Sequence, residues 1–319
     1  MKDMVVHIGM SKTGTTTLQR AVFEKHSQVC YLGKIYKSPH SWGCGSEDIY
    51  DFLSPLLWPA NHPLDVASAK KFFNETLLSE AGADRQIVGS WEGLSQQGID
   101  IFKTSVERLQ AVCGSCRIMI TVRNPVARLP SMYLQHLRGN QAQLENSFIS
   151  FEEWLGSEAQ RRGGLDQVFG YRDYIEIAIN QFGKDNVGVF VYEHFQADAN
   201  QYLQEVSGFL GIDPAETIAL ADGQRLHSRL SASQLAQMEE LNSSLLGRLR
   251  WWLASGQKRK ELVGFSDPNQ AHSSDSTGAA AQVELSPEVI ERIENAARSG
   301  NRWWVEHLGL ELEAYGYPL

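Results

Sequence analysis

The segment VVHIGMSKTGTTTLQRAV, residues 5–22, carries the side chains with the clearest chemical potential in this chain. It runs from β-branched residues into a glycine- and threonine-rich turn with one lysine, Lys12, and then into an amphipathic stretch. In such a turn the backbone N–H groups converge at a helix N-terminus, where the helix dipole favours an anion. The segment therefore predicts a site for a phosphate-like group, with hydroxyl donors from Thr15, Thr16 and Thr17 and a charge from Lys12.

The spacing of this loop differs from that of a nucleotide triphosphatase, which reads G-x-x-x-x-G-K-[ST]. Counting from Gly9, Gly14 falls in place, but Thr15 occupies the lysine position and the lysine is Lys12. The loop therefore lacks the lysine geometry for a γ-phosphate. A P-loop kinase or other nucleotide-dependent transferase, which would need Mg²⁺-dependent ATP binding, is the enzymatic alternative. A catalytically inactive nucleotide-binding relative is the non-enzymatic one.

A second segment with chemical potential is TVRNPVARLPSMYLQHLRG, residues 121–139. Arg123 is expected at the carboxyl end of a strand, Pro125 opens the next helix, and Ser131 lies about two turns into it. An arginine fork with a nearby hydroxyl suits a dianionic phosphate monoester. Arg138 follows Ser131 by seven residues and nearly in line with it. It either reaches the same phosphate or forms a surface ion pair.

Taken together, these segments resemble the sulfotransferases that use 3′-phosphoadenosine 5′-phosphosulfate (PAPS), in particular bacterial ones. HIGMSKTGTTTLQ is similar to the family's 5′-phosphosulfate loop. In the family's 3′-phosphate segment a strand-end arginine is followed eight residues later by a serine, as are Arg123 and Ser131. VYEHF, FLGI and NRWWVEHLG resemble the last core strand, the helix behind it and the closing helix. The resemblance implies PAPS as sulfuryl donor, adenosine 3′,5′-bisphosphate as product, and no required metal.

The resemblance also implies that a late basic loop closes over the 3′-phosphate and adenine. The basic run QKRK, residues 257–260, interrupts an acidic chain at such a position. An ordinary solvated run of charge is the alternative. The expected cofactor-binding residues are Lys12, Thr13, Gly14, Thr15, Thr16, Thr17, Arg123, Ser131, Arg138, Lys258 and Arg259.

Sulfuryl transfer is expected to be an in-line displacement in which positioning and charge stabilisation dominate. Lys12 would meet the charge that develops on the leaving phosphate. The attacking hydroxyl or amine also needs a general base, and Glu92 follows the apolar segment QIVGS, residues 86–90, at the same edge of a parallel sheet. Glu92 is therefore the expected base, unless it is only a helix N-terminal carboxylate favoured by the dipole.

The acceptor is expected to be a small molecule or glycan, and no motif identifies it further. His40, Trp42, Ser90 and Trp91 are the weaker candidates for acceptor or sulfate contacts. His7, within the first apolar segment, is more simply a core histidine. Residues 34–66 and 255–286 interrupt the alternation of strands and helices and are expected to form lid-like insertions, although the aromatics of the first could equally form a small core.

Apolar periodicity places these residues in an α/β fold, a single domain over 1–319 with a central, mostly parallel sheet flanked by helices and a P-loop-like site. Ligands then bind at the carboxyl ends of the strands. The expected strands are 4–10, 86–90, 117–123 and 186–193. The expected helices are 15–26, 101–112, 126–138 and 171–183.

Composition excludes several classes of protein. A net charge of −9 argues against a nucleic-acid partner. No run of about 18 apolar residues is present, and no basic segment precedes an apolar one at the start, so a cytoplasmic protein without a membrane partner is expected. Cys113 and Cys116 form a CxxC that precedes a strand and lacks a second ligand pair, so they are expected to be incidental thiols.

Overall fold

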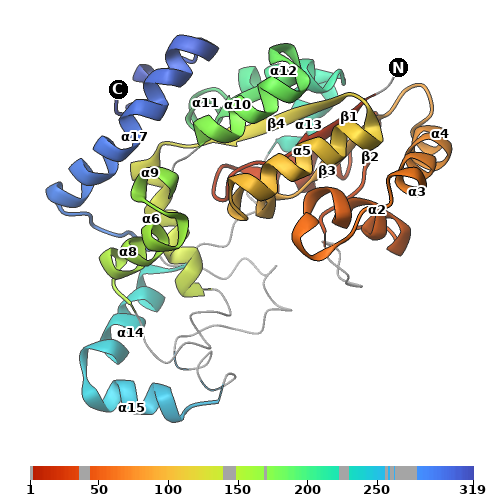
Figure 1. Ribbon diagram of the computed structural model, residues 1–319. Helices are drawn as coiled ribbons and strands as arrows, with labels where there is room; N and C mark the ends of the chain where they lie inside the picture. The colour runs from red at the N-terminus through yellow and green to blue at the C-terminus, as the bar shows by residue number, and fades with distance from the viewer. Residues whose placement is uncertain are drawn as a thin grey trace.

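The computed structural model describes residues 3–35, 44–138, 149–168, 171–222, 230–255, 258, 262 and 279–319. Within these residues a five-stranded sheet has the order β2-β3-β1-β4-β5, and all adjacent strands are parallel (Figure 1). The strands are β1 (Met4–His7), β2 (Val29–Tyr31), β3 (Gln86–Ser90), β4 (Cys116–Val122) and β5 (Val187–Val191). The parallel sheet of the predicted α/β fold is therefore confirmed.

Four of these strands fall where the apolar segments predict them. β1 ends at His7 rather than Met10, although the N–H groups of Ile8 and Met10 still donate to the carbonyls of Met119 and Thr121 in β4. β2 has no counterpart among the predicted strands, because its three residues are too few to show a period. It lies at one edge of the sheet and pairs only with β3 within the described residues.

The helix after the first turn has two parts. α1 (Thr15–Thr17) begins after Gly14 and continues directly as a π-helix, η1 (Leu18–Phe23), within the helix predicted over 15–26. The remaining α-helices are α2 (Glu47–Leu57), α3 (Val66–Lys71), α4 (Leu78–Ala81), α5 (Ile99–Cys113), α6 (Pro125–Arg138), α8 (Phe151–Arg162), α9 (Leu165–Val168), α10 (Tyr171–Phe182), α11 (Tyr192–Ala197), α12 (Ala199–Leu210), α13 (Pro214–Ala221), α14 (Ala232–Ser243), α15 (Leu245–Leu253) and α17 (Pro287–Leu308).

α2 lies inside the segment 34–66, for which the sequence predicts a lid-like insertion. The Ser46 hydroxyl caps this helix by accepting a hydrogen bond from Ile49 N–H at 3.2 Å. Its apolar side chains recur at helical spacing and are buried in the main core: Phe52, Leu53, Leu56 and Leu57. This part of the segment is therefore a helix packed in the main core. The helical spacing of its apolar residues determines its structure more than its proline content does.

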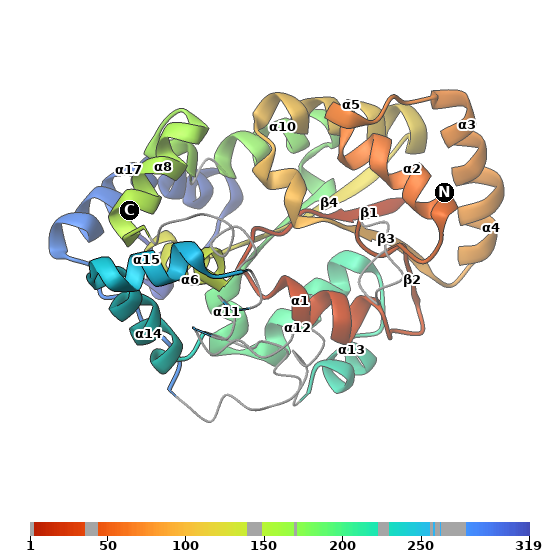
Figure 2. The same ribbon diagram turned by 90° about the horizontal axis from the view of Figure 1, so that it is seen from below.

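The two faces of the sheet bury alternate side chains of each strand, as a strand buried on both sides requires. Met4 and Val6 of β1 join an apolar cluster with α2, α5 and α10 on one face. Val5 points the other way and packs with η1 and α12. Figure 2 shows the sheet between these two helix layers. This packing on both faces fixes the positions of the carboxyl ends of the strands.

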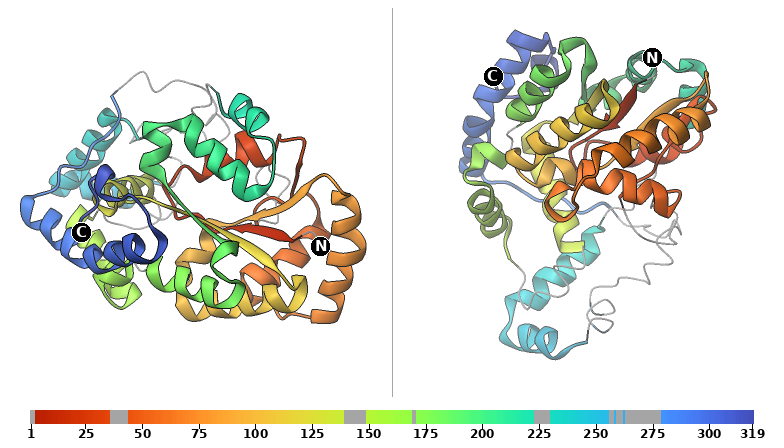
Figure 3. Two further views of the ribbon diagram at one scale, coloured as in Figure 1. Left: turned by 90° about the horizontal axis from the view of Figure 1, so that it is seen from above. Right: turned by 45° about the vertical axis from the view of Figure 1, so that its right-hand side comes forward.

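A second apolar cluster forms away from the sheet, where α6, α8, α14, α15 and α17 pack on one another. These helices occupy the left and lower parts of Figure 1 and the corresponding region of Figure 3. α17 joins the two parts of the molecule, because Ile293 packs in this cluster whereas Trp304 stacks on Tyr171 in the main core. The ring centroids of Trp304 and Tyr171 are 5.7 Å apart.

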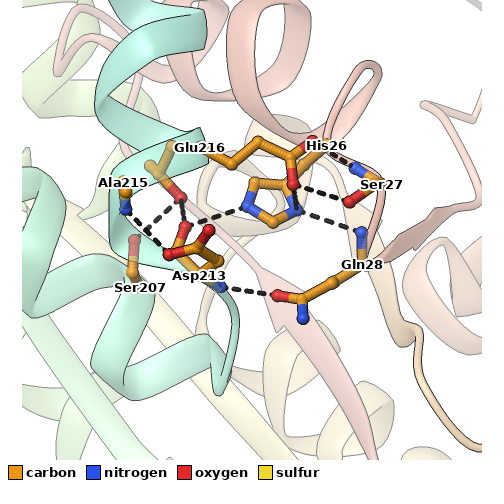
Figure 4. A network of polar contacts seen from close by, with 8 residues as sticks. His26, Ser27, Gln28, Ser207, Asp213, Ala215 and Glu216 are labelled. Atoms are coloured by element: carbon orange, nitrogen blue, oxygen red, sulfur yellow. Dashed lines mark hydrogen bonds and ion pairs between the residues drawn. The ribbon is translucent and has the colours of Figure 1, made fainter.

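The turn between η1 and β2 is tied to α13 by a polar network (Figure 4). The N–H and hydroxyl of Ser27 donate to the Glu216 carboxylate at 2.7 and 2.6 Å. Asp213 N–H donates to Gln28 Oε1 at 2.6 Å, and His26 Nδ1 lies 3.6 Å from Glu216 Oε2. These contacts fix the position at which the short strand β2 begins.

Candidate active site

The turn between β1 and α1 starts at the carboxyl end of the central strand, between the ends of β3 and β4. Two of its residues have left-handed backbone conformations, Lys12 with φ +72° and Gly14 with φ +79°. Among the described residues, Lys12 is the only non-glycine residue with a positive φ. That conformation costs an L-residue about 1–2 kcal/mol. Such strain in a non-glycine residue is typical of functional loops.

The glycines of the loop permit close approach to neighbouring elements. A Cβ atom at Gly9 would lie 2.4 Å from the Thr121 hydroxyl, 2.5 Å from a methyl group of Thr15 and 2.6 Å from His7 Nε2. A Cβ at Gly14 would lie 3.0 Å from the Tyr192 ring. The loop can therefore press against β4 and α11 only because these two positions lack side chains.

Arg123, at the end of β4, supports the loop from the side. Its Nη1 donates to the carbonyl of Lys12 at 3.0 Å, and its guanidinium lies 4.9 Å from the centroid of the Tyr192 ring. Its Nε lies 4.0 Å from Glu193 Oε1, which also accepts a hydrogen bond from Asn124 N–H at 3.1 Å. Arg123, which is predicted to bind a phosphate, therefore lies directly beside Lys12, the residue expected to supply the positive charge of the loop.

Arg128, one turn into α6, is a second arginine at the loop and was not among the predicted site residues. Its Nε donates to the carbonyl of Ser11 at 3.1 Å, and its guanidinium lies 5.0 Å from the Tyr171 ring centroid. The residue is only 2% exposed, and burial lowers the pKa of its guanidinium. Its Nη1 is buried and has no hydrogen-bond partner within the described part of the chain. A charged donor is therefore held under the loop.

Two of the loop threonines already use their hydroxyls within the protein. Thr13 Oγ1 donates to the Met10 carbonyl and shares a 2.6 Å hydrogen bond with Thr121 Oγ1. Thr15 Oγ1 donates to Glu92 Oε1 at 2.6 Å. These bonds fix the loop to β4 and to the turn after β3.

Glu92 lies beside the loop because β3 is the immediate neighbour of β1 in the sheet. It begins a short 3-10 helix, η4 (Glu92–Gln96). Besides the Thr15 hydroxyl, Lys34 contacts its carboxylate, with Nζ 3.2 Å from Oε1 and 3.0 Å from Oε2. Lys34 follows β2, so three adjacent strands bring Thr15, Glu92 and Lys34 together.

The charge state of Glu92 results from opposing effects. Burial raises the pKa of the carboxyl group, but Lys34 and the Thr15 hydroxyl stabilise the carboxylate and the net result is a lowered pKa. Glu92 is therefore ionised at neutral pH. Lys34 was not predicted as a site residue, because in the sequence it is one lysine in a loop, 58 positions from Glu92.

A buried hydrogen-bond chain lies at the end of β3, two residues before Glu92. His7 Nδ1 and Ser90 Oγ are 2.8 Å apart, and Gln19 Nε2 donates to the same oxygen at 2.7 Å. His7 is fully buried, as predicted for a core histidine. Burial lowers its pKa to about 4, with an opposing effect from Glu92 and an additional lowering by Lys34. Its imidazole is therefore neutral at pH 7.

The other predicted residues occupy more varied positions. Trp91 is 8% exposed, with its ring centroid 5.6 Å from that of Trp58. Among the remaining predicted residues, Thr17 and Ser90 are buried, Thr16 and Ser131 are half-buried, and Lys258 is exposed. Arg138 ends α6, but its side chain lies outside the described part of the structure, as do the residues His40, Trp42 and Arg259.

The described residues contain no group of three or more His, Cys, Asp or Glu side chains arranged to hold a metal ion. They also contain no helix that is long and apolar enough to cross a membrane.

Several solved structures are similar to this chain. A sulfotransferase from Alicyclobacillus acidocaldarius is 17% identical, with 83% of this chain and 97% of that chain covered and a TM-score of 0.46. The mouse sulfotransferase SULT7A1, complexed with PAP, is 14% identical, with coverage of 94% and 85% and a TM-score of 0.47. No curated protein matches the chain.

The family comparison covers most of the sequence. The model of the sulfotransferase domain matches residues 2–264, which include all five strands and the loop, Arg123, Arg128 and Glu92 described above. This match extends well beyond half of the 319 residues. The chain therefore belongs to the sulfotransferase domain family.

Proposed function

We propose that this protein transfers the sulfuryl group of PAPS to a hydroxyl or amine of a small-molecule or glycan acceptor. The observation that carries the proposal is the meeting of a strained, lysine-bearing loop with an ionised carboxylate. Lys12 lies three residues before Thr15, and Thr15 contacts Glu92 at 2.6 Å. The expected anion site and the expected proton acceptor would thus adjoin in a member of the sulfotransferase domain family.

The residues of the loop fit the anionic donor. The backbone of residues 12–17 precedes and begins nine consecutive helical residues, so its N–H groups and the helix dipole favour an anion. Arg128 adds a buried donor, Nη1, without a partner among the described residues. When bound, PAPS supplies the sulfuryl group and a phosphate leaving group. Lys12 with residues 13–17 would hold the 5′-phosphosulfate.

The 3′-phosphate would lie against Arg123 and Ser131. Arg123 emerges from β4, and Ser131 lies half-buried two turns into α6, so the two side chains come from rigid elements. Arg138, Lys258 and Arg259 are further expected contacts for this phosphate and the adenine. The guanidinium supplies paired donors and the serine a hydroxyl, which suits a dianionic monoester.

In this proposal Glu92 accepts the proton of the attacking acceptor. Thr15 and Lys34 fix the direction of its carboxylate, and the lowered pKa keeps it deprotonated. His7 is less suited, because its side chain is fully buried and an acceptor molecule could not reach it. Lys12 would stabilise the charge that develops on the leaving phosphate, the term expected to dominate such a transfer.

The compartment proposed for this reaction is the cytoplasm. Cys113 and Cys116, which are close in the sequence, are thiols and form no disulfide with each other. Free thiols are the usual state in the reducing cytoplasm.

Calorimetric titration with adenosine 3′,5′-bisphosphate and, separately, with ATP and Mg²⁺ tests the donor. The bisphosphate is expected to bind more tightly and to need no Mg²⁺, because the loop lacks a lysine after Gly14. Tighter binding of ATP with Mg²⁺ would show a kinase-like transferase instead.

A panel of phenols, amines and glycans incubated with labelled PAPS tests turnover. Label transfer to at least one acceptor class is the expected result. Bisphosphate binding without transfer to any acceptor, and without slow hydrolysis of PAPS, would identify a catalytically inactive relative. The same panel would identify the chemical class of the acceptor.

A further inference from the structure

The helix α15 exposes an unusual amount of apolar surface. Leu245, Leu246 and Leu253 are 84%, 80% and 68% exposed, and Leu249 and Trp252 are 51% and 58% exposed. Apart from Val66, at 38%, these are the large apolar side chains most open to solvent among the described residues. Clustered exposed apolar residues mark an interaction surface more often than scattered ones do.

The five side chains form one stripe along the helix. At about 100° per residue, Leu245, Leu249 and Trp252 lie nearly in line, with Leu246 and Leu253 beside them. The stripe therefore covers roughly one third of the helix circumference. It is open because the opposite side of the helix is the one that packs on the protein.

The inner side of α15 is anchored firmly. Trp251 is 2% exposed and belongs to the second apolar cluster with α6, α8 and α17. Gly247 packs so closely on the end of α14 that a Cβ there would lie 2.3 Å from the carbonyl oxygen of Leu241. The Ser244 hydroxyl caps the helix by accepting a hydrogen bond from Gly247 N–H at 2.9 Å. The apolar stripe is thus a fixed feature of the folded protein.

Positive charge borders the stripe on both sides. Arg248 and Arg250 are exposed, and by helical rotation they fall at opposite edges of the apolar stripe. The stretch from Ser244 to Ser255 contains no carboxylate, although the whole chain has a net charge of −9. Exposed Lys258 follows shortly after the helix, whereas the nearest upstream carboxylates, Glu239 and Glu240, lie on α14.

We propose that α15 binds to the surface of a membrane that contains anionic lipids. Leucines and a tryptophan between basic residues are the composition of helices that lie in the plane of the bilayer interface. Lipid phosphates complement Arg248 and Arg250, and each basic residue near such a surface contributes to binding. A twofold contact with a second copy would instead bring the arginine-bordered edges of two like-charged stripes together.

The position of α15 suits this role. In Figures 1 and 3 the helix lies at the end of the molecule farthest from the sheet, so a bilayer there would not collide with the layers around β1. The sequence predicts no membrane partner because it has no spanning segment, but a helix that lies on a surface needs no such length. The proposal is independent of sulfuryl transfer.

Co-sedimentation of the full chain with phosphatidylcholine vesicles, with and without phosphatidylglycerol, tests the proposal. The pelleted fraction is expected to rise with phosphatidylglycerol and to fall as salt is added. The Leu246→Ser/Leu249→Ser variant should lose about tenfold or more in partition coefficient. Arg248→Gln/Arg250→Gln should lose about tenfold at low salt, and only on the anionic vesicles.

The matched control is Lys70→Gln/Lys71→Gln, which removes two exposed charges from α3 at the other end of the molecule. It should bind vesicles like the wild type, and all variants should keep the wild-type melting temperature because the altered side chains are exposed. The proposal is overturned if the wild type stays in the supernatant with anionic vesicles. It is equally overturned if the Leu246→Ser/Leu249→Ser variant pellets with anionic vesicles to the same extent as the wild type. It is also overturned if the stripe forms the contact of a dimer and the protein binds no lipid.

Discussion

At Glu92, burial raises the pKa of the carboxyl group, but the charge of Lys34 and the hydrogen bonds from Thr15 and Lys34 together outweigh it and lower the pKa. A base with a lowered pKa has less affinity for a proton, but its carboxylate form predominates at neutral pH. Lys34 and Thr15 also restrict its rotation. In the proposed reaction this residue would contribute through its position and constant charge rather than through strong basicity.

Replacing Glu92 with glutamine tests that role. Glu92→Gln should lower the rate of sulfuryl transfer by about 10²–10⁴-fold, the usual contribution of a general base. The affinity for adenosine 3′,5′-bisphosphate should change little, because Lys12 and Arg123 are retained. Transfer rates and calorimetric titrations measure the two effects, with the exposed Glu24→Gln as a control. Full activity in Glu92→Gln would disprove the assignment.

His7 predicts a pH dependence of stability. Burial lowers its pKa from the usual 6.5 to about 4, so between these values the unfolded chain binds a proton that the folded chain does not. The stability it contributes is complete above pH 6.5 and declines as the pH falls towards 4. The free energy of unfolding should fall by roughly 2–4 kcal/mol over this pH interval.

Urea unfolding of the wild type and His7→Asn across that pH interval measures this effect. The free energy of unfolding should fall more steeply with acidification in the wild type than in the variant. His307→Asn, which removes an exposed imidazole at the end of α17, controls for a general loss of histidine. Equal slopes in the wild type and His7→Asn would show that His7 does not carry this dependence.

At the scale of the elements, the loop between β1 and α1 depends on a missing side chain at Gly9. Gly9→Ala should destabilise the protein by about 2–3 kcal/mol and weaken bisphosphate binding, because its methyl group would overlap Thr121, Thr15 and His7. Gly300→Ala is the matched control, since nothing lies within 4 Å of the added atom in α17.

Gly300→Ala should even stabilise the protein by about 0.5–1 kcal/mol, because alanine is more stable than glycine in the interior of a helix. Chemical denaturation measures both variants. If Gly9→Ala unfolds at the wild-type denaturant concentration, the loop can move away from β4 and its conformation is not fixed by the contacts described.

Much of the element order could be predicted from the sequence. β1, β3, β4 and β5 are apolar, β-branched runs bounded by turns, so their periodicity is visible locally. β2 could not be predicted, because its position depends on pairing with β3 rather than on its own three residues. Lys34, which follows β2, was missed for the same reason.

The site itself was only partly visible in the sequence. Lys12 and Arg123 belong to local patterns that point to an anion, and Glu92 follows a recognisable strand. Arg128 and Tyr171, by contrast, meet through packing between α6 and α10 and carry no signal in their spacing. Contacts between distant elements are set by tertiary packing, which no local pattern records.

At the scale of the whole molecule, the last residues of the chain brace the predicted phosphate site. Tyr317 donates its hydroxyl to Glu193 Oε2 at 2.9 Å, and Asn124 Nδ2 donates to the Gly316 carbonyl at 2.9 Å. Glu193 is the carboxylate beside Arg123. Residues separated by almost 200 positions therefore share one polar network.

Tyr317→Phe should lower the free energy of unfolding by about 1–2 kcal/mol, because a largely buried hydrogen bond to a carboxylate is lost. A smaller loss of bisphosphate affinity should accompany it if Glu193 helps to orient Arg123. Urea unfolding and calorimetry measure these effects. Tyr315→Phe, which deletes a hydroxyl but keeps the ring stacked on His194, is the control. Equal stability of the two variants would contradict a bracing role for Tyr317.

The central place of β1 also has a consequence for synthesis of the protein on the ribosome. β1 spans Met4–His7 and is made first, but its two partners are β3, which begins at Gln86, and β4, which ends at Val122. Until those residues emerge, both edges of an apolar strand lack their native neighbours and can pair with other chains. Pairing of both edges of β1 must therefore wait until the chain up to Val122 has emerged, and chaperone protection matters most during that interval.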